Sequence, residues 1–316
     1  MSHTANFVDR LCDAIASKGN PIVVGLDPRL DSLPPFLLKA CYATYGRTTT
    51  AVAQALWLFN RTIIDAVRDL VPAVKPQLAC YERYGVAGLQ AYVNTVTYAQ
   101  EAGLIVIADA KRNDIGSTAT LYAEAFLGSS ADPEGAITGD FVADALTVNG
   151  YLGWDGIQPF LDRAASHGRG LFVLVKTSNP SSGDIQDLLV EGRPLYEYMG
   201  ELVESWGKMT WGVHGYSAVG AVVGATYPEQ GRRLRALMPH TFFLVPGYGI
   251  QGASAADVVG YFDAHGQGAL INASRSILFA YQTSPYAEYY GAAGYGLAAR
   301  AATLAMGDEI RQALGG

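Results

Sequence analysis

Eight short apolar segments with strand-forming residues alternate with longer segments whose apolar residues recur at helical spacing. The apolar segments lie at residues 21–27, 73–79, 103–111, 145–149, 170–177, 219–226, 241–249 and 268–274. Helical spacing is clear at residues 51–70 and 89–102. Strands that alternate with helices in this way indicate βαβ units and a parallel sheet.

Eight βαβ units predict an α/β protein with a closed (β/α)8 barrel, and we expect residues 1–316 to form a single domain. A doubly wound open sheet is the alternative. Two stretches, 28–50 and 180–213, are longer than a minimal barrel requires. We expect them to add surface helices or loops, because neither has the composition of a linker or of a second domain.

Polar side chains follow nearly all of the predicted strands. They are Asp27, Lys75, Asp109, Lys111, Asn149, Lys176, Ser178, Thr226, Gln251 and Arg275. A barrel gathers these strand ends around one mouth, which is where barrel enzymes carry out their chemistry. Solvent at the strand ends would explain one or two of the charges, but it explains poorly why lysines recur after three separate strands.

Composition narrows the classes of function. Only 16% of the residues are charged, the formal net charge is −7 and the pI is about 5.2, which argues against a general binder of nucleic acid or membrane surfaces. The three cysteines are widely spaced and odd in number, so a disulfide framework or zinc site is not expected. The absence of a signal-peptide pattern and of a long apolar run predicts a cytoplasmic protein.

The most informative segment is ADAKRND, at residues 108–114, where Asp109 and Asp114 lie on either side of Lys111 in the sequence. Side chains alternate along a strand, so Asp109 and Lys111 are predicted to share one face. Charges at the end of a buried strand are costly unless they are paired or used. Two neighbouring carboxylates favour the charged form of Lys111, which suits it to donate a proton.

A phosphate-binding site is predicted near the end of the chain. The segment VPGYGIQGA (245–253) supplies Gly247, Gly249 and Gly252, and the next strand is followed by Arg275. Glycines let backbone N–H groups approach a phosphate, and barrel enzymes often bind phosphate in the loops after strands seven and eight. The same glycines spell G-x-G-x-x-G, but no acid follows at the spacing that a dinucleotide site needs.

Other chemistries have weaker support. The five histidines form no H-x-x-x-H pair, and Lys111 would compete with Mg²⁺ for Asp109 and Asp114, so no metal is expected. Lys176 at the end of a predicted strand is a rival candidate, because such a lysine can form a Schiff base with a carbonyl substrate. That chemistry needs an apolar or cationic neighbourhood that lowers the lysine pKa.

The motifs together resemble the orotidine 5′-phosphate decarboxylase family. DAKRNDIGST (109–118) fits the family's D-x-K-x-x-D-I-x-x-T pattern. VVGLDP, VKPQ, KTSNP, PGYGIQG and the Arg275 segment follow in the family's order, from about residue 20 to residue 280. The extra length is similar to the long bacterial subgroup. The resemblance implies a (β/α)8 barrel that converts orotidine 5′-monophosphate to UMP and carbon dioxide, in pyrimidine synthesis, with no cofactor.

The resemblance also implies a role for each matching residue. Lys111 would protonate C6 of the pyrimidine, flanked by Asp109 and by Asp114, the latter from the partner subunit of a homodimer. The remaining expected contacts are those of Asp27 and Lys75 with the ribose, Thr118 of the partner with the same hydroxyls, Ser178 with the pyrimidine, Gln251 with both the ring and the phosphate, and Arg275 with the phosphate.

Two alternatives remain open from the residues alone. One is a related sugar-phosphate lyase or decarboxylase that depends on Mg²⁺ or on a Schiff base at Lys176. The other is a non-catalytic nucleotide-binding barrel. The acid–lysine–acid array argues against the second alternative, because a protein that only binds nucleotides needs no proton donor at the end of a buried strand.

Overall fold

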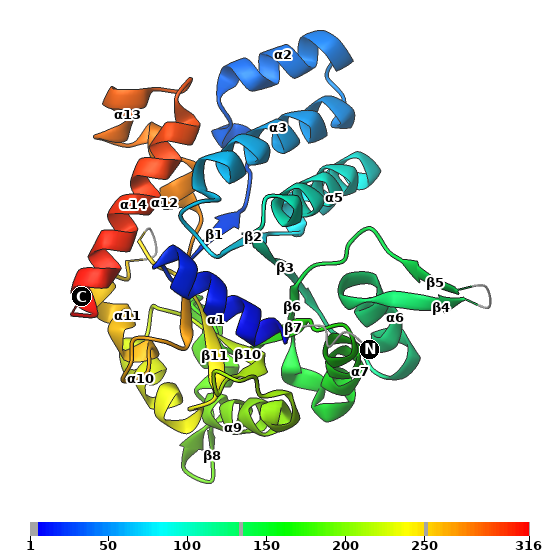
Figure 1. The fold of residues 1–316 in the computed structure, drawn as a ribbon, viewed down its shortest axis with the longest axis vertical. Helices are drawn as coiled ribbons and strands as arrows, with labels where there is room; N and C mark the ends of the chain where they lie inside the picture. The colour runs from blue at the N-terminus through cyan, green and yellow to red at the C-terminus, as the bar shows by residue number, and fades with distance from the viewer. Residues whose placement is uncertain (1–5, 133–134, 250–251, 316) are drawn as a thin grey trace.

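The computed structural model of the protein describes residues 6–132, 135–249 and 252–315, and its centre is a closed barrel of eight parallel strands (Figure 1). The order around the barrel is β1-β12-β11-β10-β7-β6-β3-β2. These strands are β1 (Ile22–Leu26), β2 (Ala73–Pro76), β3 (Ile105–Arg112), β6 (Ala145–Val148), β7 (Gly170–Lys176), β10 (Ser217–Val223), β11 (Thr241–Pro246) and β12 (Ala269–Ala273). The predicted (β/α)8 barrel is confirmed, and the open doubly wound sheet is excluded.

Helices surround the barrel and connect successive strands (Figure 1). The helices are α1 (Phe7–Lys18), α2 (Pro35–Tyr45), α3 (Thr49–Val67), α4 (Ala79–Glu82), α5 (Gly85–Glu101), α6 (Gly116–Leu127), α7 (Trp154–Ser166), α8 (Gly183–Gln186), α9 (Leu195–Gly207), α10 (Pro228–Leu237), α11 (Ala255–Val258), α12 (Arg275–Leu278), α13 (Tyr286–Tyr290) and α14 (Tyr295–Ala313). The two helices predicted from the sequence correspond to α3 and α5. In α3, Leu56, Phe59 and Ile63 are three or four residues apart and are fully buried, as expected for a helix that packs on one face.

Helix α1 closes the N-terminal end of the barrel, and it crosses the strands in the view of Figure 1. Its residues Phe7, Val8 and Leu11 are buried in one cluster with inward-facing side chains of the strands. The fit is close, since a Cβ on Gly170 would lie 2.1 Å from the Phe7 ring. This end of the interior is therefore filled with side chains, and the sequence analysis did not predict the arrangement.

The two longer stretches add surface structure, as predicted, and the second also contributes a helix that packs on the barrel. Residues 28–50 contain α2, which packs against α3. Residues 180–213 contain α8, a small hairpin of β8 (Leu189–Val190) and β9 (Arg193–Pro194), and also α9, which packs on the barrel strands. A second hairpin, β4 (Ser129–Asp132) with β5 (Gly135–Thr138), was not predicted. Short 3-10 turns lie at Leu30–Ser32, Gly150–Leu152, Pro180–Ser182, Lys208–Thr210, Val259–Tyr261 and Ala280–Gln282.

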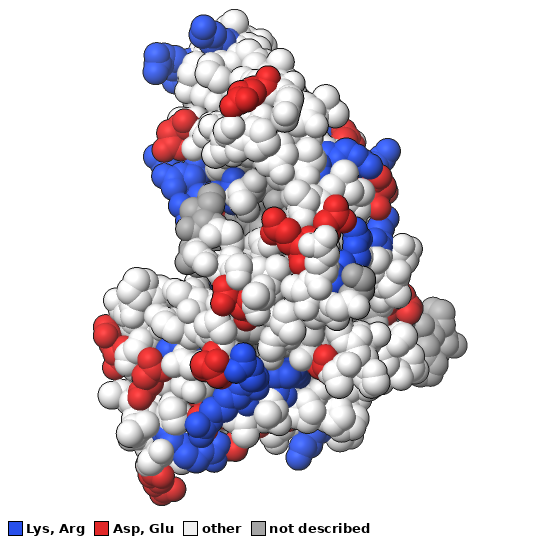
Figure 2. Space-filling view, turned by 90° about the vertical axis from the view of Figure 1, so that its left-hand side faces the viewer, with Lys and Arg blue, Asp and Glu red and all other residues white. Residues whose placement is uncertain are grey.

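Charges of both signs are interspersed on the face shown in Figure 2, with wide uncharged areas between them. Several basic groups pair with acids, for example Arg300 with Asp69 and Arg232 with Glu229. None of the described helices is long and apolar enough to cross a membrane.

Candidate active site

A cavity of about 470 Å³ opens where the barrel strands end at their C-termini. All eight strands, or the residues directly after them, contribute to its wall. The deeper wall is partly apolar, with Leu174, Val222 and Leu244, and partly polar, with Thr147 and Asn272. The size suits a small organic ligand, and the mixture of apolar and polar groups is typical of such sites.

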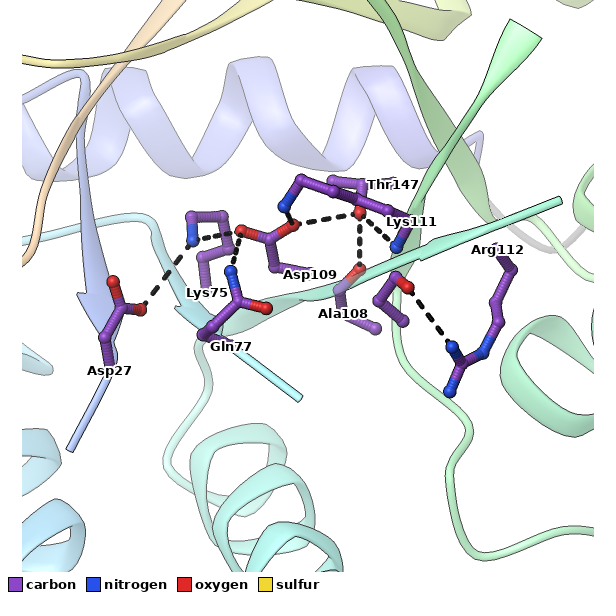
Figure 3. Close-up of polar contacts among 9 residues, drawn as sticks. Asp27, Lys75, Gln77, Ala108, Asp109, Lys111, Arg112 and Thr147 are labelled. Carbon is purple, nitrogen blue, oxygen red and sulfur yellow. Dashed lines mark hydrogen bonds and ion pairs between the residues drawn. The ribbon is translucent and has the colours of Figure 1, made fainter. Parts of the chain in front are cut away.

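The Asp109 carboxylate is the centre of a hydrogen-bonded array in this cavity (Figure 3). Nζ of Lys75 donates to Oδ2 at 2.6 Å, and Nζ of Lys111 donates to Oδ1 at 2.5 Å. Gln77 donates its side-chain N–H to Oδ2 at 3.0 Å, and the Thr147 hydroxyl lies 3.1 Å from Oδ1. The array places two ammonium groups on opposite sides of one buried carboxylate.

The charges of the array stabilise one another. Burial by itself raises the pKa of Asp109, but the ammonium groups of Lys75 and Lys111 outweigh burial and hold this pKa well below its usual range. Burial likewise favours neutral Lys75, yet the carboxylates of Asp109 and Asp27 raise its pKa above the ordinary value. Asp109 is therefore ionised and Lys75 cationic at neutral pH.

Lys111 differs from Lys75 in that it is accessible. Its side chain is 46% exposed and its ammonium group lines the cavity, whereas the Lys75 side chain is only 5% exposed. The backbone of Lys111 has φ = 48°, in the left-handed region that residues other than glycine rarely occupy. Strained backbone at such a position is a common feature of functional sites. The predicted common face of Asp109 and Lys111 is confirmed, although β3 is not a regular strand at Lys111.

Two residues of the predicted phosphate site line the cavity, whereas Gly249 and Gly252 do not. Gly247 and Arg275 contribute to the wall, together with Ser178 from the loop after β7. Gly247, Gly249 and Gly252 have φ of 106°, 76° and 97°, a conformation that glycine adopts without strain. Gln251 lies outside the described residues, so its predicted role stays a prediction.

Some predicted residues do not line the cavity in a single chain. Asp114 accepts a hydrogen bond from the neighbouring backbone N–H of Ile115, and Thr118 is exposed on α6. Neither residue is part of the cavity wall. Asn149 lines an adjacent cavity, and Thr226 donates from its exposed hydroxyl to the Ser178 carbonyl at 3.4 Å.

The suggestion that Lys176 acts at the barrel mouth is not supported by its position. Its side chain is fully buried outside the cavity wall, and Nζ contacts Oδ1 of Asp187 at 2.7 Å and the Ser182 hydroxyl at 3.1 Å. The Tyr227 ring covers the ammonium group at 4.9 Å. A paired, enclosed amine cannot reach a carbonyl substrate, so Lys176 is better explained as an anchor for the loop that follows β7.

Gln77, Thr147 and Asn272 are among the cavity residues that were not singled out from the sequence. Gln77 and Thr147 each lie two positions from a residue that was, namely Lys75 and Asn149. The alternation of side chains along strands could have found them. The described residues contain no group of three or more His, Cys, Asp or Glu side chains that could hold a metal ion.

Comparison with known proteins agrees with this geometry. The model of the orotidine 5′-phosphate decarboxylase / HUMPS family matches residues 21–290. The chain belongs to this family. An orotidine 5′-phosphate decarboxylase of Rhodopirellula baltica is 47% identical over 96% of this chain and 99% of its own length, and that of Caldicellulosiruptor bescii is 42% identical over 90% and 93%.

A solved structure of Leishmania donovani OMP decarboxylase covers 98% of this chain and 99% of its own chain, with a TM-score of 0.73 and 31% identity. The family resemblance predicted from the motifs is therefore confirmed. Because the matched region extends from just before β1 to α13, it includes every strand that lines the cavity.

Proposed function

We propose that the protein decarboxylates orotidine 5′-monophosphate to UMP and carbon dioxide, a step of pyrimidine synthesis, and that it does so without a cofactor. The observation that carries the proposal is the array of Lys75, Asp109 and Lys111 in a cavity whose wall also includes Arg275. Two relatives that cover at least 90% of the chain are decarboxylases of this substrate.

Lys111 is the proposed proton donor. Loss of carbon dioxide from C6 leaves a carbanion that the pyrimidine ring delocalises poorly. A fixed ammonium group beside C6 stabilises the developing negative charge and then supplies the proton. The 2.5 Å contact with Asp109 holds the ammonium group in place before the substrate arrives, so that little reorganisation is needed during the reaction.

The other proposed contacts follow from what the cavity wall offers. Oδ1 of Asp27 is buried, lies 3.9 Å from Nζ of Lys75 and accepts no hydrogen bond from the described residues, so it can accept one from a ribose hydroxyl. Ser178 would contact the pyrimidine, and Arg275 would form a paired contact with phosphate oxygens. The Gly247, Gly249 and Gly252 turn and Gln251 would complete the phosphate end.

A homodimer would complete the site with Asp114 and Thr118 of the partner subunit. In support, Ile115 and Leu121 beside them, and Tyr151 on the loop after β6, are exposed apolar side chains.

A cytoplasmic location is also proposed, since Cys12, Cys41 and Cys80 are all unpaired, as is usual in a reducing compartment.

The experiment is an ultraviolet assay of orotidine 5′-monophosphate consumption by purified, EDTA-treated protein. We expect turnover that does not depend on added metal. Lys111→Ala should lower kcat by about 10³-fold or more, because it removes both the charge and the proton donor, yet it should still bind UMP measurably. The control is Lys208→Ala, an exposed lysine on the turn after α9, which should leave kcat unchanged.

Folded wild-type protein that shows no turnover would reject the activity. Near-normal turnover by Lys111→Ala would reject Lys111 as the proton donor. Trapping of an enzyme–substrate adduct with borohydride, or dependence on Mg²⁺, would instead favour a sugar-phosphate lyase, and UMP binding without turnover would favour a nucleotide-binding barrel.

A further inference from the structure

The pairing of β3 with β6 is irregular at the proposed catalytic residues. Ala108 pairs with Leu146, and the next pair is Arg112 with Val148. Between these pairs β3 has three residues, 109–111, whereas β6 has only Thr147. Two extra residues therefore bulge from β3, and the backbone groups of the bulge lose their regular partners on β6.

Where the backbone hydrogen bonds between β3 and β6 are interrupted, the Thr147 side chain forms hydrogen bonds with β3 instead (Figure 3). Its hydroxyl oxygen accepts a hydrogen bond from the backbone N–H of Lys111 at 3.0 Å. The hydroxyl proton is directed to Oδ1 of Asp109 at 3.1 Å, and the other acceptor within reach, the Ala108 carbonyl, is farther away at 3.4 Å. One hydroxyl group thus contacts the backbone of one proposed catalytic residue and the side chain of the other.

These contacts matter because Lys111 is held in an unfavourable backbone conformation. A left-handed φ costs a residue other than glycine roughly 1–2 kcal/mol and persists only where the surroundings enforce it. Thr147 is 1% exposed, so its own position is fixed by packing. A fixed hydroxyl that accepts from the strained N–H is suited to hold the bulge in the conformation that directs the Lys111 ammonium group into the cavity.

We propose that Thr147 is a positioning residue for the decarboxylation, acting through Asp109 and Lys111 rather than on the substrate, and this inference rests on the proposed function. The hydroxyl orders the carboxylate and the strained backbone together, so that the ammonium group lies where negative charge develops. Displacement of a catalytic group by about 1 Å can lower a rate about 100-fold.

The test compares Thr147→Val, which keeps the branched shape but lacks the hydroxyl, with Thr147→Ser, which keeps the hydroxyl. Thr147→Val should lower kcat by about 10- to 100-fold with little change in the dissociation constant for UMP, because Lys75, Asp27 and Arg275 remain. Thr147→Ser should restore most of kcat. The control is Thr303→Val, the same change at a fully buried threonine of α14 that does not line the cavity, which should leave kcat unchanged.

The outcomes separate this inference from the proposed function. An inactive wild-type protein would reject the function, whereas an active wild type with an equally active Thr147→Val would reject only the role of Thr147. A parallel loss of kcat and UMP affinity, or failure of Thr147→Ser to restore kcat, would show that Thr147 merely supports the fold. A crystal structure of Thr147→Val provides a readout that needs no activity, and an unchanged Lys111 backbone with an unchanged Lys111–Asp109 contact would also overturn the inference.

Discussion

Asp109 combines a structural role with a proposed chemical role in one carboxylate. It is 6% exposed and contacts two lysines, one of which, Lys75, is buried. A buried ammonium group that loses its partner is strongly destabilising. The carboxylate that is proposed to prepare Lys111 for chemistry is therefore also needed to keep the buried ammonium group of Lys75 paired.

Asp109→Asn should lower the free energy of unfolding by about 3 kcal/mol at pH 7. The pKa of Asp109 is lower in the folded state, so its stabilisation is present above the unfolded pKa of about 3.9 and is lost as the pH falls through the folded value. The difference in unfolding free energy between wild type and Asp109→Asn should therefore be constant from pH 7 to about pH 5 and shrink at lower pH.

Urea denaturation of both proteins across this pH range measures the effect. Asp69→Asn is the control, because Asp69 pairs with Arg300 at the surface and its side chain is 57% exposed. Loss of that pair should change the unfolding free energy by less than about 1 kcal/mol. A difference for Asp109→Asn that grows as the pH falls would contradict the proposed charge pairing.

For individual residues, the sequence predicted which charged side chains reach the cavity better than it predicted which residues they contact. Asp27, Lys75, Asp109, Lys111 and Arg275 all reach the cavity, because strand ends of a barrel converge whatever the loops do. Lys176 ends a strand too, but Asp187, in the following loop, pairs with it outside the cavity. Alternation along β6 could have placed Thr147 at the cavity, but its contacts with Asp109 and Lys111 depend on a bulge in the pairing of β3 with β6, which no local pattern reveals.

Among the elements, α1 shows that one end of the barrel contributes packing and the other contains the candidate site. It fills the N-terminal end with apolar side chains, while the candidate site lies at the C-terminal end. The strands and the helices α3 and α5 were predictable from the period of their apolar residues. The position of α1 was not, because an amphipathic helix does not reveal in its sequence which surface it covers.

Leu11→Ala tests whether packing at the N-terminal end affects the candidate site at the C-terminal end. Leu11 is fully buried between α1 and the strands, so its truncation should lower the free energy of unfolding by about 2–5 kcal/mol. The kcat for orotidine 5′-monophosphate, measured well below the unfolding temperature, should not change. Ser17→Ala at an exposed position of the same helix should alter stability by no more than about 0.5 kcal/mol. A large loss of kcat in folded Leu11→Ala would show that the ends are coupled.

At the scale of the whole molecule, the proposed dimer concerns how the candidate site is divided between chains. One chain supplies Lys111 and Asp109 to its cavity but not Asp114 or Thr118. The sequence predicted this division through the family resemblance, not through any pattern in the chain itself. Residues that complete a neighbouring copy leave no periodic signal, because the relevant contact is absent from the fold of one chain.

Heterodimers of Lys111→Ala and Asp114→Ala subunits test the division. If Asp114 acts across the interface, one of the two sites in each heterodimer has both wild-type residues and the other has neither. Heterodimers isolated with two different affinity tags should then recover about half of the wild-type activity, although each homodimeric variant is nearly inactive. Heterodimers as inactive as both parents would place Asp114 and Lys111 in the same site of one chain, and a monomeric protein would exclude the shared site altogether.

Because of the two extra residues of β3, the number of residues between Asp109 and Lys111 should be constrained during evolution. Deleting Ala110 would shorten the bulge that brings the carboxylate and the ammonium group together. Substitutions around the pair can accumulate as the barrel diverges, but a change of length between the two would separate them. Among distant barrels of similar shape, this spacing should mark those that keep a lysine paired with a carboxylate at the end of the same strand.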